Sequence, residues 1–417
     1  MVPRDSKSIL FAALFCLGFV SFVALYRSDG NWGKLSVEEH VGLRSRGVPF
    51  VVDSTKPSSF STPEILVKAG VVAKESSGKP EVTPAASKKV AKKVAKKVPK
   101  KEIGEVVASN TDGGSVDGNC DASLDLPSYC ECLHETASQS DMELFSMNTA
   151  TVDGTSFRIN TYKTKDIVSK SIKDYGSWEL ATSREFIKAM NEHYTRLKAN
   201  DSGIEKKDVK FLDIGANIGW YSILIASMGF GVISVEPMLT NLKGFKHSIC
   251  ENNLQDLITI HETALSEEPI MCKLVSITYN VGDGTIVCGD DWSSSDPAHP
   301  TYVFRQNVTF SRLDDLISES ENIGLVKMDV EGYEAHVVGG GPKTLLHGGV
   351  PKIMSEWGPW LMHDAKSDPV EFLETFQNAG YIVRRDGFDT GQILSTRAEF
   401  DHLVEITEIG AVFFENL

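Results

Sequence analysis

The stretch that decides the fold is Phe211–Ser222, FLDIGANIGWYS. An apolar run ends at Asp213 and leads into Gly215 and Gly219, the pattern of a buried strand that turns tightly into a helix. In an open α/β sheet such a turn lies at the carboxyl end of its strand, where small molecules bind. We expect the two glycines to let the backbone pass close to a ligand where a Cβ would clash. The stretch therefore predicts either an empty tight turn or the floor of a nucleotide-like cofactor site.

The second half of the chain, from Val209 onward, alternates strand-like and helix-like segments. The predicted strands lie at residues 209–215, 231–237, 258–265, 324–332 and 351–357, with closing strands at 381–387 and 410–417. A β-rich insertion separates the third strand from the fourth. Because strands alternate with helices, we predict an α/β fold with a mostly parallel, seven-stranded sheet and helices on both faces.

The glycine-containing turn is poorly suited to a phosphate-bearing cofactor. A dinucleotide site requires G-x-G-x-x-G, but Asn217 occupies the second glycine position, and the turn has no lysine for a P-loop. S-adenosylmethionine has no phosphate and carries a ribose. A carboxylate at the end of the second strand, Glu236, is suited to the ribose hydroxyls. The turn together with Glu236 therefore predicts an S-adenosylmethionine site.

Five segments occur in a characteristic order: FLDIGANIGWYSILIA, ISVEP, ETALSE, FSRLDDLI and LVKMDVEGYEAHVVGG. Together they resemble the FkbM family of S-adenosylmethionine-dependent methyltransferases over about residues 209–417, and KMDVEG (residues 327–332) is the most specific segment. The resemblance implies a Rossmann-like class I methyltransferase fold and O-methylation of hydroxyls on sugars and natural products. It places eight residues around the cofactor: Asp213, Gly215, Asn217, Gly219 and Ser222 at the methionine part, Glu236 at the ribose, and Ala264 and Leu265 near the adenine.

The fourth and fifth strands supply candidate catalytic groups. Methyl transfer to a hydroxyl requires a positioned acceptor and a base that takes its proton. Strand alternation predicts that Lys327, Asp329 and Glu331 share one face. We expect Asp329 to touch the cofactor or the substrate, Glu331 or Glu356 to accept the proton, and Lys327 to keep the carboxylates charged. No spacing of ligand residues demands a metal ion, and none is predicted.

The N-terminus has the features of a membrane anchor. Residues 9–26 form a run of 18 residues without a charge, and as a helix this run would span roughly 27 Å. A cleaved signal peptide is the competing interpretation, but Phe22, Leu25 and Tyr26 make a poor cleavage context. We therefore predict a cytosolic tail at residues 1–8, a single type II membrane span at 9–26, and a luminal body in the Golgi or endoplasmic reticulum.

The region between the apolar run and the α/β half divides into two parts. Residues 27–119 are rich in Ser, Pro, Gly and Lys and predict a disordered, low-complexity stem. Its basic repeat at 88–101 is either an extended spacer or a binder of anionic lipid or glycan. Residues 120–208 predict a lead-in or cap region, followed by the methyltransferase domain at 209–417.

The net charge limits the possible partners of the protein, and the cysteines indicate its compartment. Residues 103–417 contain 24 Lys/Arg and 48 Asp/Glu, a net charge of −24 that argues against a nucleic-acid partner. Six cysteines lie beyond the apolar run, which is compatible with an oxidising lumen. Cys272 and Cys288 flank a predicted hairpin, so they form either a disulfide across it or two buried free thiols.

These observations favour an S-adenosylmethionine-dependent O-methyltransferase that acts on a hydroxyl of a glycan or glycoconjugate in the secretory pathway. Two alternatives remain open. One is a non-catalytic, membrane-anchored module that keeps the fold. The other is a methyltransferase for a small-molecule or lipid acceptor.

Overall fold

The computed structural model describes residues 10–16, 19–28, 31–34, 120–135, 144–163, 165–288 and 301–416. The predicted tail at residues 1–8 lies outside these residues. So does the predicted stem, apart from residues 27–28 and 31–34, and with it the basic repeat at 88–101.

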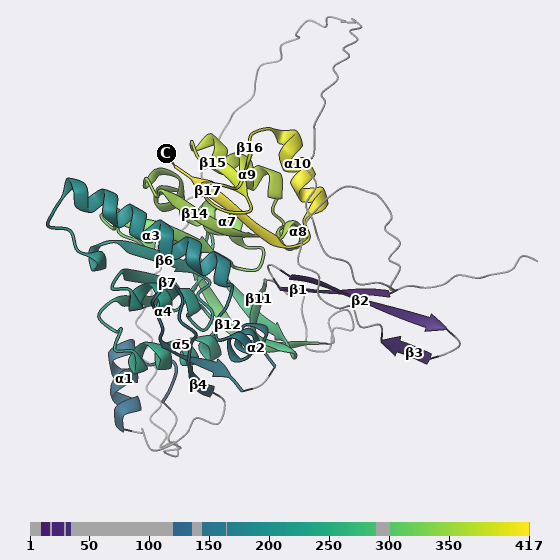
Figure 1. The fold of residues 1–417 in the computed structure, drawn as a ribbon, viewed down its shortest axis with the longest axis horizontal. Helices are drawn as coiled ribbons and strands as arrows, with labels where there is room; N and C mark the ends of the chain where they lie inside the picture. The colour runs from purple at the N-terminus through teal and green to yellow at the C-terminus, as the bar shows by residue number, and fades with distance from the viewer. Residues whose placement is uncertain are drawn as a thin grey trace, which may run out of the picture. The chain divides into compact units, whose positions relative to one another are not determined.

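The main domain is built on one eight-stranded sheet with the order β16-β15-β17-β14-β13-β6-β7-β8 (Figure 1). Its strands are β6 Lys210–Ile214, β7 Gly231–Val235, β8 Ile258–His261, β13 Ile323–Met328, β14 Lys352–Trp357, β15 Ile382–Arg385, β16 Gln392–Leu394 and β17 Gly410–Glu415. The strands from β14 to β8 pair in parallel, and β17 is antiparallel to both of its neighbours, β14 and β15. The mostly parallel α/β sheet is confirmed. The expected count of seven strands was one too low, because the short edge strand β16 pairs with β15.

Helices cover both faces of this sheet, as predicted. The strands present alternate side chains to two separate cores, so that Phe211 packs on one face and Leu212 on the other. One face packs against α3 Leu180–Asn200, α4 Trp220–Ser227 and α5 Leu239–Glu251. The other packs against α6 Leu313–Leu316, α7 Glu334–Gly340, α8 Pro359–Asp364, α9 Pro369–Asn378 and α10 Arg397–Ile406. A short 3₁₀ turn, η1 Lys206–Asp208, precedes β6, and a π-helical turn, η2 Lys343–His347, follows α7.

The β-rich insertion forms a second sheet with the order β11-β10-β12-β9. Its strands are β9 Ala264–Leu265, β10 Met271–Ile277, β11 Asn280–Val287 and β12 Tyr302–Ser311. The strand predicted at 258–265 is therefore two strands, because the chain leaves the main sheet after β8 and β9 pairs with β12. The Thr263 hydroxyl fixes this change of sheet by donating to the Thr309 carbonyl at 2.8 Å.

The lead-in region packs directly on the α/β core. It contains α1 Leu126–Glu135, the hairpin of β4 Leu144–Asn148 and β5 Arg158–Tyr162, α2 Ile167–Tyr175, and α3. Phe186 of α3 packs against Phe211 of β6, with ring centroids 5.7 Å apart. The indole of Trp220 in α4 donates to the Ser183 hydroxyl of α3 at 2.9 Å. The region thus buries part of the same core as the sheet.

Three disulfides hold the domain: Cys120–Cys132, Cys130–Cys250 and Cys272–Cys288. The third closes the β10–β11 hairpin. Of the two alternatives that the sequence left open for Cys272 and Cys288, a disulfide or two free thiols, the disulfide is confirmed. The first two tie α1 to the chain just before it and to the end of α5.

The Cys130–Cys250 disulfide closes a long loop, with a sequence separation of 120 residues. Removing it as Cys130→Ser/Cys250→Ser is expected to destabilise the fold by about 2–5 kcal/mol, since a long loop gains most conformational entropy in the unfolded chain. The measurement is the thermal unfolding midpoint under non-reducing conditions. Cys272→Ser/Cys288→Ser, with a separation of 16, is the control and should cost less. A larger shift for this control would contradict the prediction.

The N-terminal apolar run differs from its prediction. A helix was expected over residues 9–26, but the structure has three antiparallel strands, β1 Leu10–Cys16, β2 Phe19–Ser28 and β3 Asn31–Lys34. The run contains four Phe and two Val, residue types that favour strands as well as apolar helices. Among the described residues, none of the helices combines the length and the apolar character that crossing a membrane requires.

Candidate active site

A pocket of about 280 Å³ lies at the carboxyl ends of the central parallel strands. Segments that follow β6, β7 and β13 line it, together with the end of β14. The insertion and the lead-in region contribute further walls. This is the position that the α/β topology predicts for a ligand.

Nine of the twelve predicted site residues line this pocket, and three do not. Those in the lining are Gly215, Asn217, Glu236, Ala264, Leu265, Lys327, Asp329, Glu331 and Glu356. The remaining three, Asp213, Gly219 and Ser222, lie behind the pocket wall. These three residues can therefore support the predicted methionine part of the site from behind the wall, but they do not line it.

The turn after β6 needs its glycines for protein packing. Gly215 has φ +78°, and a Cβ there would lie 1.8 Å from the Asp329 carbonyl oxygen. Gly219 has φ +84°, and its Cβ would lie 2.0 Å from Cδ2 of Phe245. Asn217 between them also has positive φ, +53°. A Cβ at either glycine would therefore clash with the segment after β13 or with α5, which the turn approaches closely.

Asp213 is fully buried beneath this turn. Its Oδ2 accepts from the Ser222 hydroxyl at 2.6 Å, and its Oδ1 lies 3.9 Å from Nζ of Lys327 and has no hydrogen-bond partner. Burial raises the pKa of Asp213, an effect that the charge of Lys327 opposes. Nζ of Lys327 also donates to the Gly215 carbonyl at 2.7 Å. Asp213 and Lys327 therefore fix the turn relative to β13.

Glu236 holds the two strand ends together at the pocket wall. Its carboxylate accepts the backbone N–H groups of Asn217 and Met238, both at 2.8 Å, and the amide of Asn241 at 3.3 Å. Burial raises the pKa of Glu236 to about 7, against the effect of these hydrogen bonds. A carboxylate has about four acceptor sites, so three donors leave capacity for a ligand hydroxyl.

The wall beyond Glu236 is apolar. Ala264 and Leu265 of β9, Phe310 of β12 and Ile286 of β11 line it. Such a surface is suited to a flat heterocycle such as adenine.

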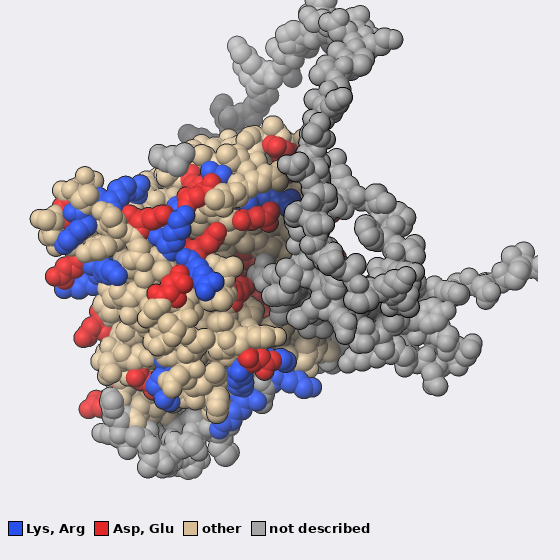
Figure 2. All heavy atoms as spheres, in the orientation of Figure 1, with Lys and Arg blue, Asp and Glu red and all other residues tan. Residues whose placement is uncertain are grey.

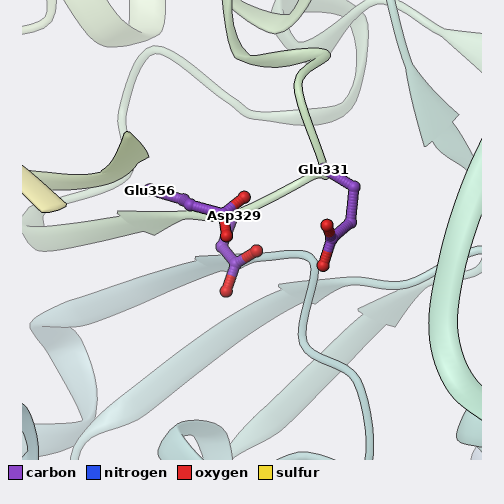
Figure 3. Close-up of side chains that lie close together, drawn as sticks. All are labelled: Asp329, Glu331 and Glu356. Atoms are coloured by element: carbon purple, nitrogen blue, oxygen red, sulfur yellow. The ribbon is translucent and has the colours of Figure 1, made fainter. Parts of the chain in front are cut away.

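Three carboxylates converge on the opposite side of the pocket: Asp329, Glu331 and Glu356 (Figure 3). Each offers an oxygen atom, and these atoms lie within 4.8 Å of one another. Asp329 follows β13 and pairs with Lys327 at 3.3 Å. Glu331 has φ +55° and lies beyond the end of β13 at Met328. The orientation of the Glu331 side chain is therefore set by a turn. The strand alternation from which its position was predicted does not extend to this residue.

The electrostatics of this cluster favour the protonated forms of Glu331 and Glu356. Burial raises the pKa of Glu356 well above its usual value, and the charges of Asp329, Glu334 and Asp283 raise it further. Burial likewise raises the pKa of Glu331, followed by the charge of Glu356. Oε2 of Glu356 is buried and has no hydrogen-bond partner. A carboxylate of this kind has a lone pair free to take a proton.

Three further acidic residues lie at or behind the pocket, and two of them, Glu179 and Asp283, were not predicted. Glu179 of the lead-in lines the pocket and accepts from the Tyr221 hydroxyl at 2.5 Å, and it has a positive φ of +39°. Asp283 of the insertion shares a hydrogen bond with Glu331. Glu334 is only 1% exposed and accepts the N–H groups of Val330 and Gly332. No sequence signal marks the first two, because segments far apart in the chain bring them to the pocket.

Residues 213–383 match the model of the methyltransferase FkbM domain. The chain contains an FkbM methyltransferase domain. The matched segment begins in β6 and ends in β15, so it includes both the turn after β6 and the carboxylate cluster. The comparison with curated proteins finds no match.

Solved structures similar to this chain include methyltransferases. A human methyltransferase 10 domain containing protein is 11% identical, with 60% of this chain and 93% of that chain covered and a TM-score of 0.29. The 16S rRNA N2 G1207 methyltransferase of T. thermophilus, solved with AdoMet and guanosine, is 9% identical, with 66% and 52% covered and a TM-score of 0.29. The precorrin-6y C5,15-methyltransferase of Geobacter metallireducens is 9% identical, with 54% and 87% covered and a TM-score of 0.25.

Proposed function

We propose that this protein is an S-adenosylmethionine-dependent O-methyltransferase that acts on a hydroxyl of a glycan or glycoconjugate in the secretory pathway. The observation that carries the proposal is the pocket at the strand ends. It places Glu236 and an apolar wall on one side and the cluster of Asp329, Glu331 and Glu356 on the other.

The charge of the pocket fits this cofactor. Lys327 is the sole Lys or Arg among the described residues that line it, and its Nζ is engaged by the Gly215 carbonyl and by Asp329. A pyrophosphate would meet carboxylates with no free cation to pair with it. The sulfonium and ammonium groups of S-adenosylmethionine carry positive charge, which the surrounding carboxylates favour. The unpartnered Oδ1 of buried Asp213 adds to the negative potential behind the turn.

The residues divide into holding and reacting groups. Glu236 would hold the ribose, Ala264 and Leu265 the adenine, and the turn Gly215–Ile218 the methionine part. The bound cofactor supplies a methyl group on a cationic sulfur. Asp329 would orient the acceptor hydroxyl, and Glu356 would take the proton of that hydroxyl on its unpartnered oxygen. Lys327 positions the Asp329 carboxylate through their contact at 3.3 Å.

Titration calorimetry of the full chain tests the cofactor. S-adenosylmethionine is expected to bind, whereas NAD and ATP are not, because both carry phosphates into an acidic pocket. Glu236→Gln should weaken S-adenosylmethionine binding at least tenfold, since the amide loses an acceptor for the turn and for the ribose, a change of about 1.4 kcal/mol or more. Failure of the intact chain to bind S-adenosylmethionine, or equal binding of NAD, would remove the proposal. Radiolabelled methyl donor with a panel of glycans then identifies the acceptor.

Three disulfides support the secretory compartment, because such bonds persist mainly in oxidising environments. Two sequons, beginning at Asn200 and Asn307, have exposed asparagines. We expect at least one to carry N-linked glycan when the full chain is expressed in eukaryotic cells. The measurement is a gel shift on endoglycosidase treatment, with Asn200→Gln/Asn307→Gln as the control. A wild-type chain without any shift, with free thiols at its cysteines, would place the domain outside the lumen.

A further inference from the structure

Glu179 is an acidic residue of the pocket at the strand ends to which no role has been assigned so far. It lines the pocket together with Trp178 and Thr182. It comes directly before α3, yet its side chain makes no hydrogen bond to the first turn of that helix, as the side chain of an N-cap residue usually does. Figure 2 shows acidic and basic side chains interspersed over the face where Figure 1 draws α3. Glu179 differs from these exposed charges because it faces the pocket.

The backbone at Glu179 is strained. Its φ of +39° and ψ of +60° lie in the left-handed region, which residues with a Cβ rarely adopt. Such strain persists only where surrounding contacts maintain it, and it is concentrated at functional sites. Here the contacts come from α4, because the Phe186 ring of α3 packs on the Tyr221 ring with centroids 4.9 Å apart. The start of α3 is thereby held beside the start of α4, which follows the turn after β6.

Two hydroxyl groups orient the Glu179 carboxylate. The Tyr221 hydroxyl donates to its Oε2 at 2.5 Å, and the Thr182 side chain forms a further hydrogen bond with it. Burial raises the pKa of Glu179, an effect that both hydrogen bonds and the charge of Lys327 oppose. A carboxylate has about four acceptor sites, so two hydroxyl donors leave about two for a ligand.

The positive partner of this carboxylate is not supplied by the protein. Within the described part of the chain, no basic side chain forms an ion pair with Glu179. Lys327, the basic residue of the pocket lining, pairs with Asp329 at 3.3 Å and donates to the Gly215 carbonyl. A carboxylate held in a pocket is stabilised most by a cation that also donates hydrogen bonds. An ammonium group has both properties.

We propose that Glu179 binds the ammonium group of the methionine part of S-adenosylmethionine, and that Tyr221 positions the Glu179 carboxylate. The inference rests on the proposed function and adds to it a cofactor-binding residue from the lead-in region. Glu236 and Glu179 would then hold the ribose and the amino-acid end of the cofactor. An acceptor hydroxyl is a weaker occupant of this place, because a neutral donor gains less from a carboxylate than an ammonium group does.

Calorimetry of the full chain with three analogues separates the groups of the cofactor. S-adenosylhomocysteine carries the ammonium and carboxylate groups, decarboxylated S-adenosylhomocysteine keeps the ammonium group alone, and methylthioadenosine has neither. We expect the first two to bind about tenfold or more tightly than methylthioadenosine. In Glu179→Gln both should lose this advantage, whereas methylthioadenosine should bind as it does to the wild type. Its unchanged binding shows that the adenosine side of the pocket is still folded.

Two further variants complete the design. Tyr221→Phe removes the hydroxyl and keeps the ring, so the two ammonium-bearing analogues should lose about three- to tenfold in affinity. Glu185→Gln is the matched control, because Glu185 lies on α3 but does not line the pocket. It should bind all three analogues as the wild type does.

Two results would overturn the inference and leave the methyltransferase proposal standing. One is undiminished binding of decarboxylated S-adenosylhomocysteine to Glu179→Gln. The other is an equal loss of affinity for all three analogues in that variant, which would indicate a structural role for Glu179. An intact chain that bound neither S-adenosylmethionine nor any of the analogues would remove the proposed function and this inference together.

Discussion

Replacing Glu356 with glutamine is expected to lower the rate of methyl transfer by about 10²–10⁴-fold, the usual contribution of a general base. Binding of S-adenosylmethionine should be unchanged, because Glu236 and the apolar wall lie on the other side of the pocket. The measurement is the initial rate with radiolabelled donor and the acceptor found in the glycan screen, beside calorimetry of the donor alone.

The choice of Glu356 over Glu331 follows from their partners. Glu331 shares a hydrogen bond with Asp283, so its proton is already held between two carboxyls. Oε2 of Glu356 has no partner, and Figure 3 shows its side chain extending toward Asp329. Of these two glutamates, Glu356 is therefore the one we expect to accept a proton from a hydroxyl near Asp329.

The pH dependence gives an independent check of this role. The pKa of Glu356 is raised well above its usual value, chiefly by burial. Below that pKa the carboxyl is protonated and cannot act as a base, so the wild-type rate should rise as the pH increases through it. Glu356→Gln should lose this rise. Its thermal midpoint should not fall, because the amide replaces a buried carboxyl whose ionised form is disfavoured by burial and by the charges of its neighbours.

Glu185→Gln provides the matched control for this substitution. Glu185 of α3 also has a pKa raised by burial, but it bonds to the N–H of Phe388 and does not line the pocket. Its glutamine variant should keep the wild-type rate and pH profile. If Glu356→Gln kept the wild-type rate, the base would have to be another group, and loss of the pH rise in Glu331→Gln would identify Glu331.

Gly215→Ala is expected to destabilise the domain by roughly 3–5 kcal/mol, combining the cost of a positive φ with that of overpacking. The new Cβ would lie 1.8 Å from the Asp329 carbonyl oxygen, a backbone atom that cannot rotate away. The turn must therefore move off β13 and break the hydrogen bond from Lys327 to the Gly215 carbonyl. Thermal unfolding and S-adenosylmethionine calorimetry measure the two consequences, a lower midpoint and lost binding.

Gly349→Ala separates the two causes. Gly349 has φ +69°, close to that of Gly215, but its Cβ would meet nothing within 4 Å. We expect it to cost only the backbone strain, about 1–2 kcal/mol. Equal losses of stability in the two variants would contradict the prediction, because they would show that the close approach of Gly215 to Asp329 adds nothing to the cost of the substitution.

Local patterns account for much of the fold. The apolar runs before Gly215, Glu236 and Asp329 predicted β6, β7 and β13 at nearly their observed positions, because a buried parallel strand needs a continuous apolar segment. The same patterns misjudged two places. The apolar run at 9–26 fits both a helix and strands, and the segment at 258–265 contains a change of sheet that hydrophobicity does not mark.

Long-range pairings lay beyond such patterns. Cys130 and Cys250 are 120 residues apart, and apart from the hairpin pair Cys272 and Cys288 no local pattern favours one pairing of the cysteines over another. Glu179 reaches the pocket from the lead-in region because α3 packs on β6, a contact between segments with no shared local pattern.

The sequence by itself determined which residues end the central strands, and therefore which groups gather at one edge of the sheet. The reason is that strand ends follow from local hydrophobicity and turn residues. Only the tertiary structure decided which of those groups are accessible. Asp213 is buried beneath the turn and does not line the pocket, whereas Glu356 lines it. The accessibility of a side chain depends on which distant segments of the chain pack against it. Distant segments also explain the glycines of FLDIGANIGWYS, because a Cβ at Gly215 or Gly219 would clash with the Asp329 backbone or the Phe245 ring.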